Sequence, residues 1–279
     1  MLGQVGIAHQ IEDYAHATAQ AVEKPFWDFP VEKRRLYFEK NNGEMQESKK
    51  SFGNIRTDKE EHLATVGPAY KIVTHQEILD LFDPYVKLFG EASRTITMSP
   101  NGARVAATYT FKNITKEVAK GDRVGFVLHA IGGYDGKTAV KLSVAGIRLA
   151  CLNGMVSHEK TINLSYAHND NKILDMQFPN SEAIIDMFDK DIARWSRLTE
   201  APVNWPDQIS QFENHILTTP GLISPSREDN FVDKTREFRT AWDAYNYLTH
   251  EVTHVQKTNL FTKLNRLRKI NNAVEMLIG

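Results

Sequence analysis

The chain has 279 residues, of which 41% are hydrophobic and 10% aromatic, which is enough to bury the core of one main globular domain. Its 34 lysines and arginines nearly balance its 35 aspartates and glutamates, so any nucleic-acid site has to be a local basic patch. The single cysteine, Cys151, excludes an internal disulfide and suits a reducing cytoplasm. The N-terminus lacks the apolar run of a signal peptide, and no stretch approaches the roughly 20 apolar residues that a membrane span needs.

The first part of the chain is expected to form an N-terminal helix and a charged arm. Residues 4–23 have modest helical amphipathicity, which predicts a helix that ends before Pro25. Residues 31–40 are charged and predict a surface helix, and the segment from there to about residue 63 predicts a loop.

Two short elements are expected to follow. Residues 70–73 read as a short strand because of their branched and aromatic side chains. Thr74 and Glu77 have the spacing of a capping box, which predicts a helix over 75–89.

Two β-hairpins are predicted in the middle of the chain. Residues 94–98 and 103–112 flank a Ser-Pro-Asn-Gly turn, and residues 122–131 and 137–150 flank the glycine-rich turn 132–136. Apolar residues alternate along these strands, so one sheet face is expected in the core and the other is expected to be partly wet and basic. A wet, basic face is a candidate ligand surface.

The remainder is expected to be mostly helical. Residues 156–168 can extend the sheet, and Asn180 is expected to cap a helix that reaches residue 199 and packs on the sheet. The predicted fold is therefore α+β, an antiparallel β-hairpin sheet covered by a long helix, with a C-terminal helical extension. Its expected parts are an N-terminal helix and charged arm (1–66), the sheet and helix core (67–200), and a connector with C-terminal helices (201–279), including one short helix at 207–217 and a helical pattern over 231–277.

His250, Glu251 and His254 match the H-E-x-x-H pattern of zinc proteases on a predicted helix. A catalytic zinc also needs a third protein ligand. The common H-x-x-G-x-x-H continuation is missing, because Lys257 stands where it requires Gly and Leu260 where it requires His. A zinc-dependent hydrolase through these three residues stays open as an alternative, but we expect no metal and no other cofactor.

Other tempting motifs have simpler explanations. The Gly136-Lys137-Thr138 triplet ends like a phosphate-binding loop, but Ile131 stands where the first glycine belongs and a strand pattern follows. Cys151 reads as a small buried residue near a strand end. The aspartates of the 181–199 helix read as its polar face, and they are Asp186, Asp189 and Asp191.

Several segments resemble a known group of proteins. The sequence G-Y-D-G at 133–136 followed by R-L-A-C-L-N-G at 148–154 is similar to the H-D-G-S … R-x-x-C-x-N core of phage and plasmid-like proteins classed as a domain of unknown function. Residues 70–73 and 240–249 are similar to the flanking blocks of that family, so the resemblance covers roughly 65–255. The chain has Tyr134 where the family usually has His, and Lys137 where it has Ser.

A more distant likeness is to the single-strand annealing proteins of phage recombination, the RecT, Redβ and Erf superfamily, because the chain shows the same order of β-hairpins followed by a long helix. This likeness implies a protein of the bacterial host cytoplasm that binds single-stranded DNA as a ring or helical homo-oligomer and anneals it without ATP. The alternative from another class is a protein-interaction or inhibitor module of phage or plasmid origin that uses the C-terminal helices. The candidate phosphate contacts are Arg104, Lys137, Lys141, Arg148 and Lys160, with Tyr134 as a candidate platform for base stacking.

Overall fold

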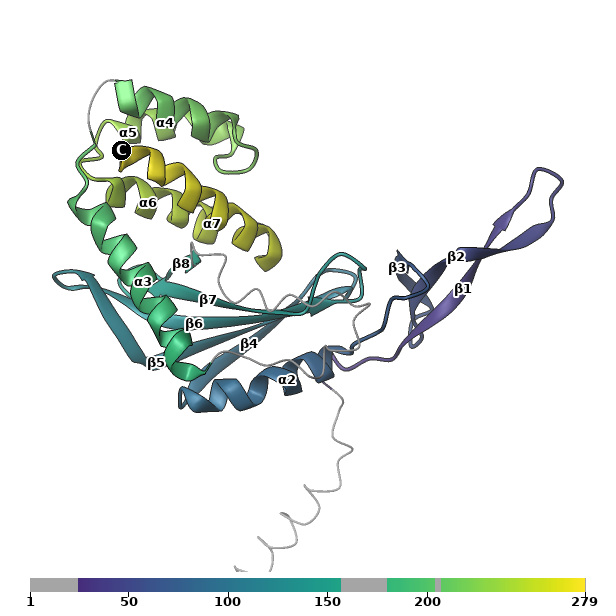
Figure 1. Cartoon of the computed structure of the whole chain (residues 1–279). Coiled ribbons are helices and arrows are strands. Elements are labelled where there is room, and N and C mark those ends of the chain that lie inside the picture. Colours follow the sequence, from purple (N-terminus) through teal and green to yellow (C-terminus); the bar gives the residue numbers. More distant parts are fainter. Residues whose placement is uncertain (1–24, 157–179, 204–206, 279) are drawn as a thin grey trace, which may run out of the picture.

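The computed structural model describes residues 25–156, 180–203 and 207–278 (Figure 1). Two antiparallel sheets and a set of helices make up these ranges, so the α+β prediction is confirmed. The helix expected at 4–23, and the part of the predicted extension after residue 156, lie outside the described residues. Within the described ranges, no helix combines the length and the apolar content that crossing a bilayer requires.

The larger sheet has five antiparallel strands in sequence order, β4-β5-β6-β7-β8. Both predicted hairpins are confirmed, and the strands around the second turn pair from Ile131 with Lys141 to Val124 with Arg148. The long β5 and β6 pair along nearly their whole length. The strand bounds are β4 Ala92–Met98, β5 Arg104–Ala119, β6 Asp122–Gly133, β7 Lys141–Arg148 and β8 Asn153–Val156.

Helices α2 (His75–Leu88) and α3 (Ser181–Glu200) cover one face of this sheet, which we call the first face. The predicted capping box at Thr74 and the predicted cap at Asn180 both form. Phe126 of β6 packs on Phe188 of α3, with ring centroids 5.2 Å apart. The apolar alternation of the strands therefore ends in a buried helix-on-sheet core, as expected.

The second face carries the C-terminal helices near the β7–β8 edge (Figure 1). Asn153 of β8 donates from Nδ2 to the carbonyl oxygen of Asn246 (3.2 Å) and to Thr249 Oγ1 (3.3 Å), and Asn271 donates to the carbonyl oxygen of Val156 (2.7 Å). The final helices are therefore bonded directly to the last strand. Their bounds are α4 Asp207–Thr218, a 3-10 turn Pro225–Arg227, α5 Glu228–Thr235, α6 Ala241–His250, a π-helical turn Glu251–Val255, α7 Leu260–Val274 and a 3-10 turn Glu275–Leu277.

The segment predicted as a surface helix and loop forms a second sheet instead. Its strands are β1 (Val31–Glu39), β2 (Met45–Arg56) and β3 (Glu61–Val66), in the order β1-β2-β3. The helix prediction at 31–40 is wrong because this segment exposes most of its side chains on both faces, so no apolar alternation marks the strand in the sequence. The ribbon projects away from the body of the molecule (Figure 1).

The short strand predicted at residues 70–73 is also absent, because this segment forms no strand ladder. Its apolar side chains serve packing instead. Tyr70 and Val73 are buried, and the Tyr70 hydroxyl donates to the carbonyl oxygen of Gly133 at 3.0 Å. The segment therefore links the two sheets without extending either.

Candidate nucleic-acid interface

A basic pocket opens on the second face of the larger sheet, between the β6–β7 turn and the first half of α7. Its volume is about 400 Å³. The described residues that line it include four cations and no carboxylate. The lining consists of Arg104, Lys137, Lys141 and Arg268, with Ile131, Thr138, Ala139, Phe261, Leu264 and Asn265.

Strand register brings two of these cations together. Arg104 begins β5 opposite Gly133, and Lys141 begins β7 opposite Ile131, so both stand at the same end of the sheet. Side chains alternate between the two faces of a strand, which places Arg104 and Lys141 opposite the apolar row that packs on α2 and α3. The alternation of side chains predicted from the sequence thus places two basic residues together on the second face.

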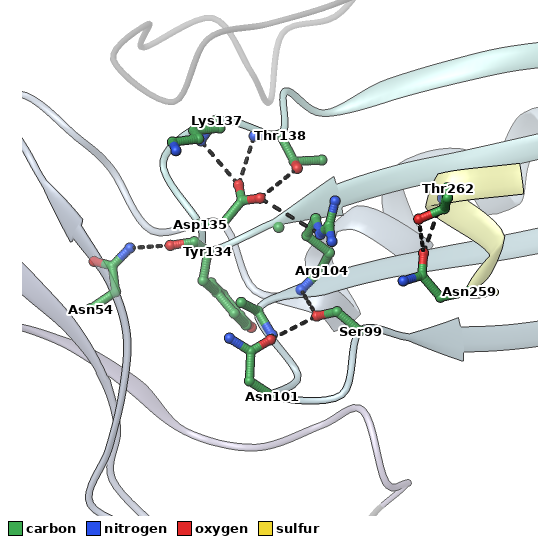
Figure 2. Close-up of polar contacts among 12 residues, drawn as sticks. Asn54, Ser99, Asn101, Arg104, Tyr134, Asp135, Lys137, Thr138, Asn259 and Thr262 are labelled. Carbon is green, nitrogen blue, oxygen red and sulfur yellow. Dashed lines mark hydrogen bonds and ion pairs between the residues drawn. The ribbon is translucent and has the colours of Figure 1, made fainter. Parts of the chain in front are cut away.

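The β6–β7 turn holds Lys137 at the rim of the pocket (Figure 2). Asp135 accepts hydrogen bonds from the backbone nitrogens of Lys137 (3.0 Å) and Thr138 (2.7 Å), and also from the Thr138 hydroxyl (2.8 Å). Gly136 adopts a φ of 68° between them, a conformation that most other residues adopt only with strain. The turn is therefore fixed by its own side chain.

Arg104 connects the turn with α7. Its Nε lies 3.7 Å from Asp135 Oδ2, and its guanidinium carbon lies 4.6 Å from the centroid of the Phe261 ring. The guanidinium group thus contacts the carboxylate of Asp135 and the aromatic ring of Phe261. This contact closes one wall of the pocket.

Lys141 and Arg268 carry charges that no described carboxylate pairs with. Both side chains are half-buried, and the described part of the chain places no salt bridge on either. Burial lowers the pKa of Lys141 and of Arg268, and the Arg268 charge lowers the pKa of Lys141 further. Two neighbouring cations without a counterion raise the free energy of the empty pocket, and an anionic ligand would relieve this repulsion.

A row of hydrogen-bonding groups leads away from the pocket across the second face. Thr95 of β4 pairs with Thr108 of β5, which pairs with His129 of β6, which pairs with Ser143 of β7. The Thr108 hydroxyl and His129 Nδ1 are 2.9 Å apart. Burial, and secondarily the Arg268 charge, lower the pKa of His129 to about 4, so its imidazole is neutral at physiological pH. These residues form a neutral, polar strip on the second face, in which His129 is buried and Thr108 and Ser143 are half-buried.

Tyr134 is not available as a stacking platform, which corrects the prediction made for it. Its side chain is fully buried, its ring stacks on His75 with centroids 4.2 Å apart, and its hydroxyl accepts from the His75 backbone nitrogen at 2.9 Å. Asn54 of β2 donates to its carbonyl oxygen at 2.7 Å (Figure 2). The prediction failed because the smaller sheet, which the sequence did not reveal, covers this end of the hairpin.

The buried histidines predict an acid-sensitive fold. Burial lowers the pKa of His75 to about 3 and that of His129 to about 4, whereas an unfolded histidine titrates near 6.5. Between these pKa values the unfolded chain binds more protons than the folded chain. Each histidine is therefore expected to lower the free energy of unfolding by about 2 kcal/mol when the pH falls from about 7 to about 5.

This linkage is tested by urea unfolding at both pH values. His75→Phe keeps an aromatic ring against Tyr134 and removes one of the two buried imidazoles, so the variant is expected to lose about 2 kcal/mol less than the wild type on acidification. An equal loss in the two proteins would contradict the assignment.

Arg148 belongs to a different cluster, at the other end of β7. Its guanidinium binds Asp122 through Nε (2.7 Å) and Nη2 (2.7 Å), which raises its pKa. Trp242 of α6 donates to the same carboxylate at 3.0 Å, and Arg148 Nη1 lies 3.5 Å from Cys151 Sγ. Arg148, predicted as a phosphate contact, thus joins the sheet to α6. Lys160, the other residue expected at phosphate, lies outside the described residues.

Of the H-E-x-x-H residues, the two histidines lie side by side at the surface and the glutamate binds an arginine. His250 and His254 are exposed, with ring centroids 5.0 Å apart. Glu251 is 1% exposed and binds Arg227 through both carboxylate oxygens, at 2.5 and 2.8 Å. Its carboxylate is therefore occupied and not free to activate a metal-bound water. The described residues contain no group of three or more side chains of the kinds that could hold a metal ion.

Arg268 is the pocket residue that the sequence analysis did not include among the candidate phosphate contacts. The spacing of the residues could have revealed it. Phe261, Leu264 and Arg268 recur at intervals of three and four residues and therefore share one side of α7. That side faces the pocket.

Comparisons with known proteins give one match. No curated protein and no solved structure matched the chain. The family model described as "Domain of unknown function (DUF932)" matches residues 62–275, which include the larger sheet, the pocket and the helices from α2 to α7. The chain therefore belongs to the DUF932 family.

Proposed function

We propose that the protein binds single-stranded DNA at the basic pocket and anneals complementary strands without ATP, acting as an oligomer. The observation that carries the proposal is the cluster of Arg104, Lys137, Lys141 and Arg268 around one opening, among which only Arg104 has a carboxylate partner in the described residues. Phosphates are the common ligands of such unpaired cations.

The polar strip favours a ligand longer than a single phosphate. Thr108 and Ser143 follow the pocket cations across the same face and are half-buried, so their hydroxyls are neutral donors and acceptors, whereas the His129 that lies between them is buried. Such groups bind sugar and phosphate oxygens without reading a particular base. A strand that places its phosphates at the cations can therefore extend along the sheet.

The guanidinium plane of Arg104 favours single strands over duplex. Phe261 and Leu264 of α7 form one wall but are themselves buried, and the Arg104 guanidinium, on a partly exposed side chain, lies against Phe261. Such a plane accepts the flat face of an unstacked base, which a duplex hides. The near-neutral net charge fits this local mode of binding, because the cations are concentrated at one place.

The proposal is tested by fluorescence anisotropy of a labelled poly-dT oligonucleotide titrated with protein at about 50 mM and about 200 mM salt. Three to four phosphate contacts predict a loss of affinity of about 20- to 50-fold between the two conditions, because counterions are released on binding. A duplex of the same length is expected to bind more weakly, and complementary oligonucleotides are expected to anneal faster with protein and no ATP.

Two results would contradict the proposal. They are the absence of binding at low salt, and binding that does not change with salt. A stable complex with a host protein, combined with no affinity for DNA, would favour an interaction module instead.

A further inference from the structure

The smaller sheet ends in a two-stranded ribbon that nothing in the described chain covers. The pair Phe52–Val66 is the last pairing of β2 with β3, and beyond Phe52 only β1 accompanies β2. We call residues 36–51 the arm. It extends away from the body of the molecule (Figure 1). An isolated two-stranded ribbon is marginally stable in water, so docking against another surface would stabilise the arm.

The end of the arm exposes large apolar side chains. Tyr37, Phe38 and Met45 are 56%, 51% and 63% exposed. Met45 pairs with Glu39, which is two residues from Tyr37 on the same strand, so Tyr37 and Met45 lie on one face of the ribbon. Phe38, the residue after Tyr37, lies on the other face. Apolar side chains on both faces of one tip indicate a segment that inserts into a partner.

The body of the molecule has a matching groove of about 490 Å³ where α2 ends, α3 begins and β5 passes. Its floor is apolar, and Leu88 at its edge is 61% exposed. Of the three carboxylates on its rim, Asp186 pairs with Lys190 and Asp189 with Lys116, so Glu182 is the rim acid without a salt bridge in the described residues. The arm carries Lys49 and Lys50, to which the described chain gives no carboxylate partner. The lining residues are Leu88, Phe89, Ile114, Ser181, Glu182, Ile185, Asp186 and Asp189.

The arm and the groove of one chain stand at opposite ends of α2. His75, the first residue of α2, stacks on Tyr134 at the root of the smaller sheet, and Leu88, the last, lines the groove. The 14 residues between them span about 21 Å, and the arm points away from the groove (Figure 1). The arm therefore fits the groove of another copy and not its own.

We propose that the arm of one protomer docks its apolar tip into the α2–α3 groove of the next copy of this chain, with Lys49 and Lys50 near the acidic rim and Glu182 in particular. The contact joins two different surfaces, and when two copies do not exchange arms reciprocally it is head-to-tail and continues from copy to copy into a ring or a helical filament. This interface does not depend on DNA binding.

Site-directed cross-linking tests the interface in the full-length protein. In a Cys151→Ser background, Met45→Cys and Leu88→Cys are made as two separate proteins, mixed, and treated with a short bismaleimide. The mixture is expected to give a covalent dimer that neither protein gives alone. A dimer from Met45→Cys alone that equals or exceeds the mixed product would overturn the proposal, because it would mean that two arms meet each other.

Light-scattering mass provides the second test. The triple substitution Tyr37→Ser, Phe38→Ser and Met45→Ser is expected to raise the protein concentration needed for assembly by at least about tenfold, since a few buried aromatic and Met side chains dominate most interfaces. Glu182→Lys is expected to weaken assembly in the same direction. The matched control is Lys59→Ser, an exposed residue of the β2–β3 turn outside the arm.

The outcomes that overturn the proposal are a wild-type protein that stays monomeric, and a triple variant that assembles like the wild type. If the arm variants are monomeric and still bind poly-dT, the interface stands and the binding site is independent of it. If they assemble normally but bind no DNA, the interface proposal fails and DNA binding depends on the arm.

Discussion

Replacing Lys141 and Arg268 together by glutamate is expected to lower the affinity for single-stranded DNA by about 100-fold or more at low salt. Each charge-assisted contact with a phosphate contributes about 1.5–3 kcal/mol, so two lost contacts exceed the 2.7 kcal/mol or so that corresponds to 100-fold. The slope of log affinity against log salt should also become shallower by about 1.4, since each single-strand phosphate contact adds about 0.7.

The matched control carries the same change in net charge outside the pocket. Arg123 stands at the other end of β6 and Lys269 is exposed on α7, and neither lines the pocket. The double variant Arg123→Glu and Lys269→Glu is expected to bind within about threefold of the wild type at moderate salt, where distant charges are screened. Equal losses in the two double variants would show that only the overall charge matters and would contradict the assignment of the pocket.

Asp122→Ala is expected to destabilise the protein by about 2–3 kcal/mol, the largest effect on stability that we expect from removing a single polar contact group. Asp122 is the common acceptor for Arg148 and Trp242, and the side chains of the ion pair are only 13% and 23% exposed. Removing it leaves a largely buried guanidinium and an indole N–H without their acceptor. The measurement is urea unfolding followed by tryptophan fluorescence and by far-UV circular dichroism.

Two variants separate this contact from general effects of substitution. Asp122→Asn keeps an oxygen that can accept from Trp242, so it is expected to lose about half as much stability. Arg123→Ala removes an exposed neighbour and should change the unfolding free energy by less than about 0.5 kcal/mol. If Asp122→Ala unfolds like Arg123→Ala, the cluster does not hold α6 on the sheet.

The sequence predicted the strands of the larger sheet from their apolar alternation and their turn residues. Val124, Phe126 and Leu128 alternate with other side chains, and the turn residues around Gly136 place the hairpin correctly. The second face is less wet than predicted, because β6 is buried on both faces from Val124 to Gly133. The arm was missed because Tyr37, Phe38 and Met45 are exposed on both faces of a ribbon, so neither a helical nor a strand period appears.

In the candidate site, too, only the features that depend on neighbouring residues were predicted. The alternation of side chains along β5 and β7 was enough to place Arg104 and Lys141 on one face of the sheet. Arg268 could not be added without knowing that α7 returns over the sheet, and Tyr134 was misplaced because the sheet that buries it was not foreseen. Residues whose surroundings come from distant segments are the ones for which sequence reasoning failed.

The pocket is lined by residues from distant parts of the chain, so its parts are synthesised at different times. The strands that carry Arg104, Lys137 and Lys141 leave the ribosome well before α7, which supplies Phe261 and Arg268. A nascent chain therefore displays a sheet with a partial set of cations, and the complete cluster exists only after α7 docks on β8. The proposed binding site is thus complete only when the fold is complete.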